Sequence, residues 1–235
     1  MEANFHMNKI TISIFLILAI ARYSAMSQVN SSAGQDSLKN KSNTETDYSE
    51  NSFIDSRDNQ VYSFIEIDGK KWMAENLNFK SPKSLIYDNN EKNADTYGRL
   101  YTWEEAKCSC PENWRLPTED EWQQLEKTIG LDQMTIDSIG WRGTPYGNVL
   151  KSKNNKTWLN SIHDSPKTSG FDGIAGGLAY NNDYFANIGL GGYYWTSTNY
   201  YSSFAWSRYL NYNKGDIFRN ISIITWYFSV RCIQD

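Results

Sequence analysis

The tryptophans of this 235-residue chain are confined to its later part, and they mark where a folded core can form. All nine lie between Trp72 and Trp226. Residues 28–52 are instead rich in Ser, Asn, Asp and Lys, and they carry too little apolar surface to offset the entropy of ordering. We therefore expect a disordered polar spacer over residues 28–52. A single domain should follow over residues 53–235, a length sufficient for one hydrophobic core.

The N-terminus has the three parts of a secretory signal peptide. Lys9 precedes an uncharged apolar run over residues 10–21, and Ala25-Met26-Ser27 supplies small residues for cleavage. The run is shorter than the roughly 20 residues that a transmembrane helix needs. We therefore expect residues 1–27 to be a signal peptide, with an uncleaved membrane anchor as the alternative. The mature chain is expected to lack a membrane span and to be secreted, periplasmic or on the cell surface.

Charge and histidine content argue against several functions. The formal net charge of −4 becomes −5 when Glu2, Lys9 and Arg22 leave with the signal, so a nucleic-acid partner is not expected. His163 is then the one remaining histidine, and with three cysteines it makes a poor ligand set for zinc. It lies in the polar sequence of residues 160–166, where we expect a solvated loop side chain rather than a catalytic base.

Local patterns predict a hairpin and two helices in the first half of the domain. Residues 61–67 resemble a strand, Asp68-Gly69 a type I′ turn, and residues 70–73 the returning strand. The segments Thr102-Trp103-Glu104-Glu105 and Thr118-Glu119-Asp120-Glu121 have the capping-box pattern that begins a helix. After the second of these, the apolar residues at i, i+3 and i+7 share one face and are expected in the core: Trp122, Leu125 and Ile129.

The second half of the domain has few helical signals. Residues 140–192 are rich in Gly, Asn, Ser and Tyr, which indicates long loops and short strands. Strands are predicted over residues 193–198, 204–210 and 227–233. Early helices among antiparallel strands, with a loop-rich middle, indicate the α+β class.

Ordered motifs cover nearly all of the chain after Asp55. They are Asp68-Gly69-Lys70-Lys71-Trp72-Met73-Ala74-Glu75-Asn76-Leu77, Tyr97-Gly98-Arg99-Leu100-Tyr101-Thr102-Trp103, Cys110-Pro111-Glu112-Asn113-Trp114-Arg115-Leu116-Pro117-Thr118 with Glu121-Trp122, Gly170-Phe171, Trp195-Thr196-Ser197-Thr198 and Ser229-Val230-Arg231-Cys232. In this order they resemble the Fibrobacter succinogenes major paralogous domain family. The resemblance implies a surface or secreted protein of Bacteroidota- or Fibrobacter-like bacteria, and it implies no particular biochemical activity.

The segment Arg115-Leu116-Pro117-Thr118-x-x-Glu121-Trp122 also resembles the main helix start in formylglycine-generating relatives of the C-type lectin fold. This implies a C-type-lectin-like domain with two helices, antiparallel strands, paired terminal strands and long loops. That helix and the last strand are neighbours in such folds, so the resemblance implies a Cys110–Cys232 disulfide, which an oxidising compartment favours. Cys108 would then be free or compete for Cys232.

Two enzymatic chemistries lack the residues that they need. Formylglycine-generating enzymes use two late cysteines, and residues 170–227 contain none. An acid/base pair for glycoside cleavage has candidate carboxylates, but Glu105 and Glu121 already have helix-capping roles and no motif unites the rest: Glu75, Glu104 and Asp120. We therefore expect no catalytic residues.

Calcium-dependent sugar binding in C-type lectins uses Glu-Pro-Asn or Gln-Pro-Asp and Trp-Asn-Asp motifs, and this chain has none of them. Loop oxygens could still bind the ion, although Asn and Asp in loops more often form turns. No cofactor is expected. A calcium site remains possible, and its oxygen ligands would come from Asp172, Asn181, Asn182, Asp183 and Asn187.

Aromatic side chains crowd residues 180–212, where Tyr193-Tyr194 and Tyr200-Tyr201 should each present one member outward. Exposed Tyr beside Asn resembles a sugar-stacking surface or a paratope. A noncatalytic module that binds a glycan or a surface protein is thus the leading hypothesis, with an enzyme on the formylglycine-generating scaffold and an envelope structural subunit as alternatives. The predicted ligand-binding residues are Tyr184, Tyr194, Tyr200, Tyr201 and Asn182.

Overall fold

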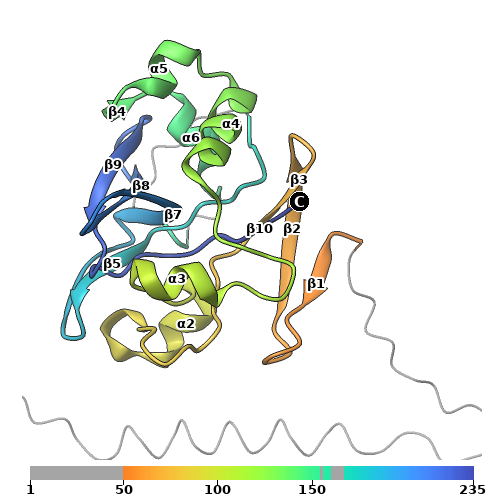
Figure 1. Cartoon of the computed structure of the whole chain (residues 1–235), viewed down its shortest axis with the longest axis vertical. Coiled ribbons are helices and arrows are strands. Elements are labelled where there is room, and N and C mark those ends of the chain that lie inside the picture. Colours follow the sequence, from red (N-terminus) through yellow and green to blue (C-terminus); the bar gives the residue numbers. More distant parts are fainter. Residues whose placement is uncertain (1–49, 154–155, 160–166) are drawn as a thin grey trace, which may run out of the picture. The chain divides into compact units, whose positions relative to one another are not determined.

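The structure, a computed structural model, describes residues 50–153, 156–159 and 167–235. The predicted signal peptide, the spacer up to residue 49 and His163 lie outside these residues. The described part belongs to the α+β class, with helices beside two β-sheets (Figure 1). None of its helices is long and apolar enough to cross a bilayer.

The smaller sheet joins the two ends of the domain. Its strand order is β1 (Ser52–Ile54), β2 (Val61–Ile67), β3 (Lys70–Met73) and β10 (Ile233–Gln234). The β2–β3 hairpin is confirmed, and positive φ angles at both turn residues fit the type I′ turn that its sequence predicts. Strand β10 pairs antiparallel with β3, so the last residues of the chain complete a sheet begun by the first (Figure 1).

Helix α4 (Glu119–Ile129) begins where its capping box predicts. The Thr118 side chain accepts from the Glu121 amide, and the Glu121 carboxylate accepts from the Thr118 amide. Trp122 and Leu125 are fully buried on the predicted apolar face. The helix therefore packs its apolar face against the core.

Only one of the two hydrogen bonds of the predicted capping box forms at the start of helix α3 (Trp103–Ser109). Thr102 accepts from the Glu105 amide as predicted, but the Glu105 carboxylate accepts from the amide of Lys83 instead of returning to Thr102. A loop distant in sequence thus competes for the side chain. The remaining helical turns are too short to give a helical period, and the sequence patterns missed them: η1 (Tyr87–Asn89), α2 (Glu91–Tyr97), α5 (Gln133–Asp137) and α6 (Tyr146–Leu150).

The larger sheet has six strands and carries most of the late half of the chain. All its neighbouring pairs are antiparallel except β5 and β7, which run parallel. The turns of the β5–β6 and β7–β8 hairpins therefore point toward the same end of the sheet (Figure 1). The order is β4 (Gly140–Arg142), β9 (Ile217–Ile223), β8 (Phe204–Asn211), β7 (Gly191–Tyr201), β5 (Gly176–Asn181) and β6 (Tyr184–Ile188).

The last predicted strand, residues 227–233, is wrong over most of its length. Only Ile233 and Gln234 form a regular strand, while residues 227–229 make single bridges to three different segments. Ser229 and Arg231 are as completely buried as their apolar neighbours Phe228 and Val230. The segment runs through the core rather than along a sheet surface, so its alternation does not separate an inner from an outer face.

The structure contains the disulfide that the resemblance implies. Cys110, directly after α3, is bonded to Cys232, with the Cα atoms 5.8 Å apart. Cys108 is exposed and forms no disulfide. The bond ties the segment before α4 to the C-terminal segment in the core.

Five charged side chains form a buried network between α4 and the large sheet. Arg208 donates to Glu119 at 2.8 Å and to Glu126 at 2.6 Å. Arg219 donates to Glu119 at 2.7 Å, and Arg142 donates to Glu126 at 2.5 Å. Burial by itself raises the pKa of Glu119, but the charges and hydrogen bonds of Arg208 and Arg219 outweigh it and hold the pKa below its usual value. The network thus keeps the buried Glu119 carboxylate ionised.

Glu121 links helix capping to acid stability. Burial raises the pKa of its carboxyl, but hydrogen bonds from Arg115 and from the Thr118 amide outweigh burial, and the pKa falls to about 2. An unfolded Glu titrates near pH ~4.3. Because the folded pKa is lower than the unfolded pKa, ionised Glu121 stabilises the fold fully above the unfolded value. This stabilisation is lost as the pH falls from the unfolded toward the folded pKa.

The variant Glu121→Gln is expected to lose about 1 kcal/mol of stability at neutral pH, because a helix cap is weakened. Its unfolding should depend less on pH in the acid range than that of the parent chain. Urea unfolding at a series of acid pH values measures both effects, with Asp120→Asn on the same helical turn as the control. An unchanged acid dependence in Glu121→Gln would contradict the role of this carboxylate.

Candidate functional site

Three partly exposed aromatic rings lie together at the end of the large sheet where the two hairpin turns point. The Tyr180 ring contacts the Tyr184 ring at 5.4 Å and the Trp226 ring at 4.9 Å, centroid to centroid. Tyr184 is 61% exposed. We call these rings, with the polar turn residues Asn181, Asn182 and Asp183, the hairpin surface.

The turn of the β5–β6 hairpin is held by one amide side chain. Asn181 Oδ1 accepts from the backbone amides of Asp183 and Tyr184, each at 3.0 Å. The side chains of Asn182 and Asp183 stay exposed at the tip. The turn thus presents an amide and a carboxylate beside the aromatic rings.

The C-terminal segment forms the other side of the hairpin surface. The backbone of Tyr227 pairs with Ala179, and its phenol donates to Asn182 Oδ1 at 3.1 Å. Burial raises the pKa of Tyr227, so the phenol stays protonated and remains a donor. A pocket of about 470 Å³ lies here, lined by Tyr180, Asn181, Asn182, Asp183, Thr225 and Tyr227.

The predicted ligand-binding residues separate into three places. Tyr184 and Asn182 belong to the hairpin surface. Tyr200 and Tyr201 lie at the β7–β8 turn, where Tyr200 packs edge-on against Trp206 and Tyr201 is 70% exposed. Neither of these two tyrosines lines the hairpin pocket.

The prediction that Tyr194 faces a ligand is wrong. Its side chain is completely buried, its ring packs against Trp122 and Phe171, and its hydroxyl donates to the Ile174 carbonyl at 2.9 Å. Position 194 of β7 faces helix α4, so the half-exposed member of the pair is Tyr193. Strand alternation predicts that one member is inward but not which one.

The sequence patterns missed Thr225, Trp226 and Tyr227 as site residues. They lie in an Ile-Ile-Thr-Trp-Tyr-Phe run that resembles a core strand. A turn after β9, where the Trp226 amide donates to the Ile223 carbonyl, instead brings them beside β5. This proximity comes from pairing across about 50 residues, and no local signal reveals it.

The five residues suggested for calcium do not all lie together: Asn181, Asn182 and Asp183 share the hairpin turn, but Asp172 and Asn187 lie elsewhere. Asp172 lines a different pocket from Asn182 and Asp183, Asn181 caps its own turn, and Asn187 donates to the Tyr193 hydroxyl. In the described part of the chain no group of three or more His, Cys, Asp or Glu residues is arranged to hold a metal ion.

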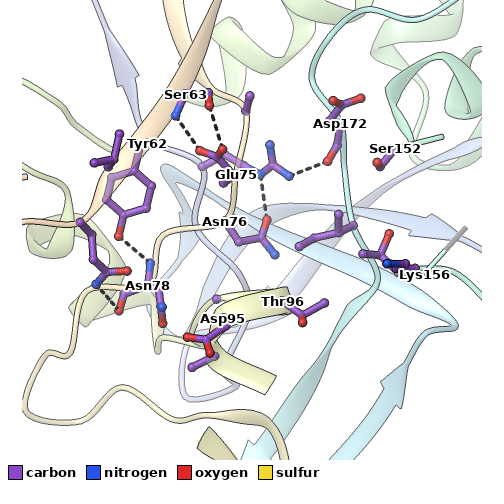
Figure 2. Close-up of a pocket in the computed structure, with 18 residues that line it drawn as sticks. Tyr62, Ser63, Glu75, Asn76, Asn78, Asp95, Thr96, Ser152, Lys156 and Asp172 are labelled. Atoms are coloured by element: carbon purple, nitrogen blue, oxygen red, sulfur yellow. Dashed lines mark hydrogen bonds between the residues drawn. The ribbon is translucent and has the colours of Figure 1, made fainter. Parts of the chain in front are cut away.

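A second hollow, the polar pocket, lies between the β2–β3 hairpin, α2 and the loop that carries Asp172 (Figure 2). Its volume is about 650 Å³. Of the carboxylates considered as an acid/base pair, Glu75 lines this pocket, whereas Glu104 pairs with Lys107 and Glu121 caps α4. They therefore do not converge on one reacting centre.

The family resemblance is supported by comparison with known proteins. The sequence model described as the Fibrobacter succinogenes major domain matches residues 65–234. This range includes the disulfide, the lining of the hairpin pocket and the lining of the polar pocket from residue 74 onward. No curated protein and no solved structure gives a significant match. The chain belongs to the Fibrobacter succinogenes major domain family.

Proposed function

We propose that this protein is an exported, noncatalytic binding module that recognises a glycan through the hairpin surface. The observation that carries the proposal is the cluster of Tyr180, Tyr184 and Trp226 beside an exposed amide and carboxylate. An aromatic face packs against the apolar face of a sugar ring. The amide and the carboxylate accept hydrogen bonds from its hydroxyls, and the amide also donates to them. The hollow of about 470 Å³ beside these rings, to which Tyr180 and the turn residues contribute, has room for one or two sugar rings.

A glycan fits this surface better than a protein partner does, because the hollow is lined mainly by polar groups around a few rings. A protein interface usually has a larger apolar centre that excludes water. The exposed Tyr201 at the neighbouring hairpin turn could extend the contact to a longer oligosaccharide, since both turns point to the same end of the sheet.

The variant Tyr184→Ala is expected to weaken glycan binding ~fivefold, because an aromatic stacking contact is worth about 1 kcal/mol. The ligand is first identified on a glycan array, and its affinity is then measured by calorimetry. Met134→Ala, which removes an exposed apolar side chain from α5, is the control and should bind like the parent chain.

Two results would contradict the proposal. One is an array and calorimetry without any bound glycan while a pull-down captures a surface protein that Tyr184→Ala no longer binds. The other is a chemical turnover of a small substrate by the purified chain, which would favour the enzyme alternative.

Export and the lectin-like architecture belong to the same proposal. Export is supported by the signal-peptide pattern and by the Cys110–Cys232 disulfide, which persists in oxidising compartments. The architecture is supported by the pairing of β10 with the N-terminal hairpin and by the two capped helices. Mass spectrometry of the secreted protein should find Gln28 at its N-terminus, which tests export. A crystal structure that does not superpose on C-type lectins would reject the lectin-like architecture.

A further inference from the structure

Lys151, directly after helix α6, has a buried side chain. The residue is 1% exposed, and its Nζ atom lies 5.4 Å from the centre of the Trp158 ring. A lysine normally keeps its ammonium group in water, because removing the charge from water costs free energy. The burial of this amine is therefore unusual.

Three oxygen atoms surround the amine. Lys151 Nζ donates to the backbone carbonyls of Asn211 and Lys214, each at 2.6 Å, and to Asn148 Oδ1 at 3.1 Å. Asn148 belongs to α6, whereas Asn211 ends β8 and Lys214 lies in the turn of residues 212–216, which leads to β9. The side chain thus joins α6 to this β8–β9 turn.

Helix α6 and the β8–β9 turn also meet through their backbones. The Gly147 amide donates to the Gly215 carbonyl at 2.8 Å, and a Cβ at Gly147 would lie 2.8 Å from the same carbonyl oxygen. Because the amine is enclosed between helix and turn, and two of its three hydrogen bonds go to Asn211 and Lys214, opening of the turn is the movement that brings water to it.

The charge of the amine is not neutralised by an ion pair. Among the residues that the structure describes, none forms an ion pair with Lys151, and its three oxygen ligands are neutral. Burial lowers the pKa of Lys151 to about 7, although the charge of Asp216 acts in the opposite direction. The charged and titratable side chains of the elements around it are Tyr146 of α6, Tyr212, Lys214 and Asp216 of the turn, and Lys156, Lys167 and Asp172 of the loop segments.

We propose that Lys151 makes the β8–β9 turn sensitive to pH, because protonation of its buried amine promotes opening of the turn away from α6. In acid the closed turn encloses an uncompensated charge, and opening hydrates that charge. In alkali the enclosed amine is neutral and still has two N–H donors, one for each carbonyl of Asn211 and Lys214. Opening also carries Lys214 away from the Trp141 ring, which its Nζ atom approaches to 5.2 Å.

The direction of the effect follows from proton binding. In the closed form the pKa of Lys151 is about 7, and in the open, hydrated form it is near ~10.4. Between these values the open form binds more protons, so the equilibrium constant for opening falls ~tenfold for each pH unit of increase. Below the lower value both forms are protonated, and the constant no longer depends on pH.

NMR of the purified chain with isotope-labelled lysine measures the titration directly. One lysine resonance should titrate near neutral pH while the exposed lysines titrate near pH ~10.4, and this resonance should be absent from Lys151→Met.

Amide hydrogen exchange measures the opening of the turn. The amides of Asn213 and Lys214 report it, because they donate to Asn211 Oδ1 and to the Asn211 carbonyl. After correction for intrinsic exchange, their protection in the parent chain should rise ~tenfold per pH unit above neutral pH, and in Lys151→Met it should stay constant.

Three further variants serve as controls. Lys214→Gln removes an exposed lysine from the same turn, and His163→Gln removes the one histidine of the mature chain, which lies outside the described residues. Both should keep the pH dependence of the parent chain. Asp216→Asn removes the charge that favours the protonated amine, so the midpoint of the titration should move to lower pH. This shift tests the proposal even where Lys151→Met fails to fold.

Three results would overturn the proposal. They are a Lys151 amine that titrates with the exposed lysines, protection of the turn that does not change with pH in the parent chain, and an equal pH dependence in Lys151→Met. None of them bears on glycan binding at the hairpin surface, whose pocket is not lined by Lys151.

Discussion

Replacing Arg208 with alanine is expected to lower the free energy of unfolding by about 3–5 kcal/mol, because two carboxylates would remain buried without their shared partner. Arg208 is completely buried and contacts both Glu119 and Glu126. Arg219 and Arg142 each reach only one of these carboxylates, so neither can replace it. Urea unfolding at neutral pH measures the loss.

The control for Arg208→Ala is a surface ion pair. Lys107→Ala removes the partner of the exposed Glu104 and is expected to cost less than about 1 kcal/mol. A second variant, Arg208→Met with Glu126→Gln, removes one charge of each sign and should recover part of the lost stability. An equal free energy of unfolding for Arg208→Ala and the parent chain would contradict this role. It would mean that Glu119 and Glu126 become hydrated or protonated without a large loss of stability.

The variant Cys232→Ser is expected to lose about 4–5 kcal/mol of stability, since the disulfide closes a loop with a sequence separation of 122 residues. The entropy of the unfolded chain rises when this loop is opened. Cys232 is also completely buried, so the serine hydroxyl needs a new hydrogen-bond partner in the core. Thermal and urea unfolding under oxidising conditions measure the effect.

Cys108→Ser is the matched control, because Cys108 is exposed and outside the disulfide. It should leave stability unchanged in oxidising buffer. Adding a reductant should lower the stability of the parent chain and of Cys108→Ser by the same amount, and it should not affect Cys232→Ser. A Cys232→Ser variant as stable as the parent chain would show that the core alone holds the C-terminal segment.

Local patterns predicted the elements whose signals are contained within about ten residues. The β2–β3 hairpin follows from Asp68-Gly69 between two alternating runs, and α4 follows from its capping box and apolar face. In such elements the backbone hydrogen bonds and the deciding side chains are close in sequence. The interactions that stabilise these elements are therefore formed within the segment itself.

Features decided by distant partners were either mispredicted or not predicted at all. Glu119 has the sequence position of a helix N-terminal residue, which is normally exposed, yet it is buried by Arg208 and Arg219 from β8 and β9. Tyr194 is inward because β7 packs on α4. The 227–233 segment has a strand pattern, but it fills the core between the sheets instead of extending one of them.

The candidate sites divide in the same way. Tyr184 and Asn182 were predicted as ligand residues from the crowding of Tyr and Asn alone, and the structure places them on the β5–β6 hairpin. Trp226 and Tyr227 join them only through the pairing of residues 179 and 227, and the polar pocket exists only where four separate segments meet.

The sequence by itself determined the family, the α+β class, the first hairpin and the capped helix α4, since each rests on residues that are neighbours along the chain. The tertiary structure alone decided which tyrosine is buried, which charged side chains pair in the core and which side chains surround each hollow. Burial and hydrogen bonding of these groups depend on partners 50 to 150 residues away, and no local pattern contains that information.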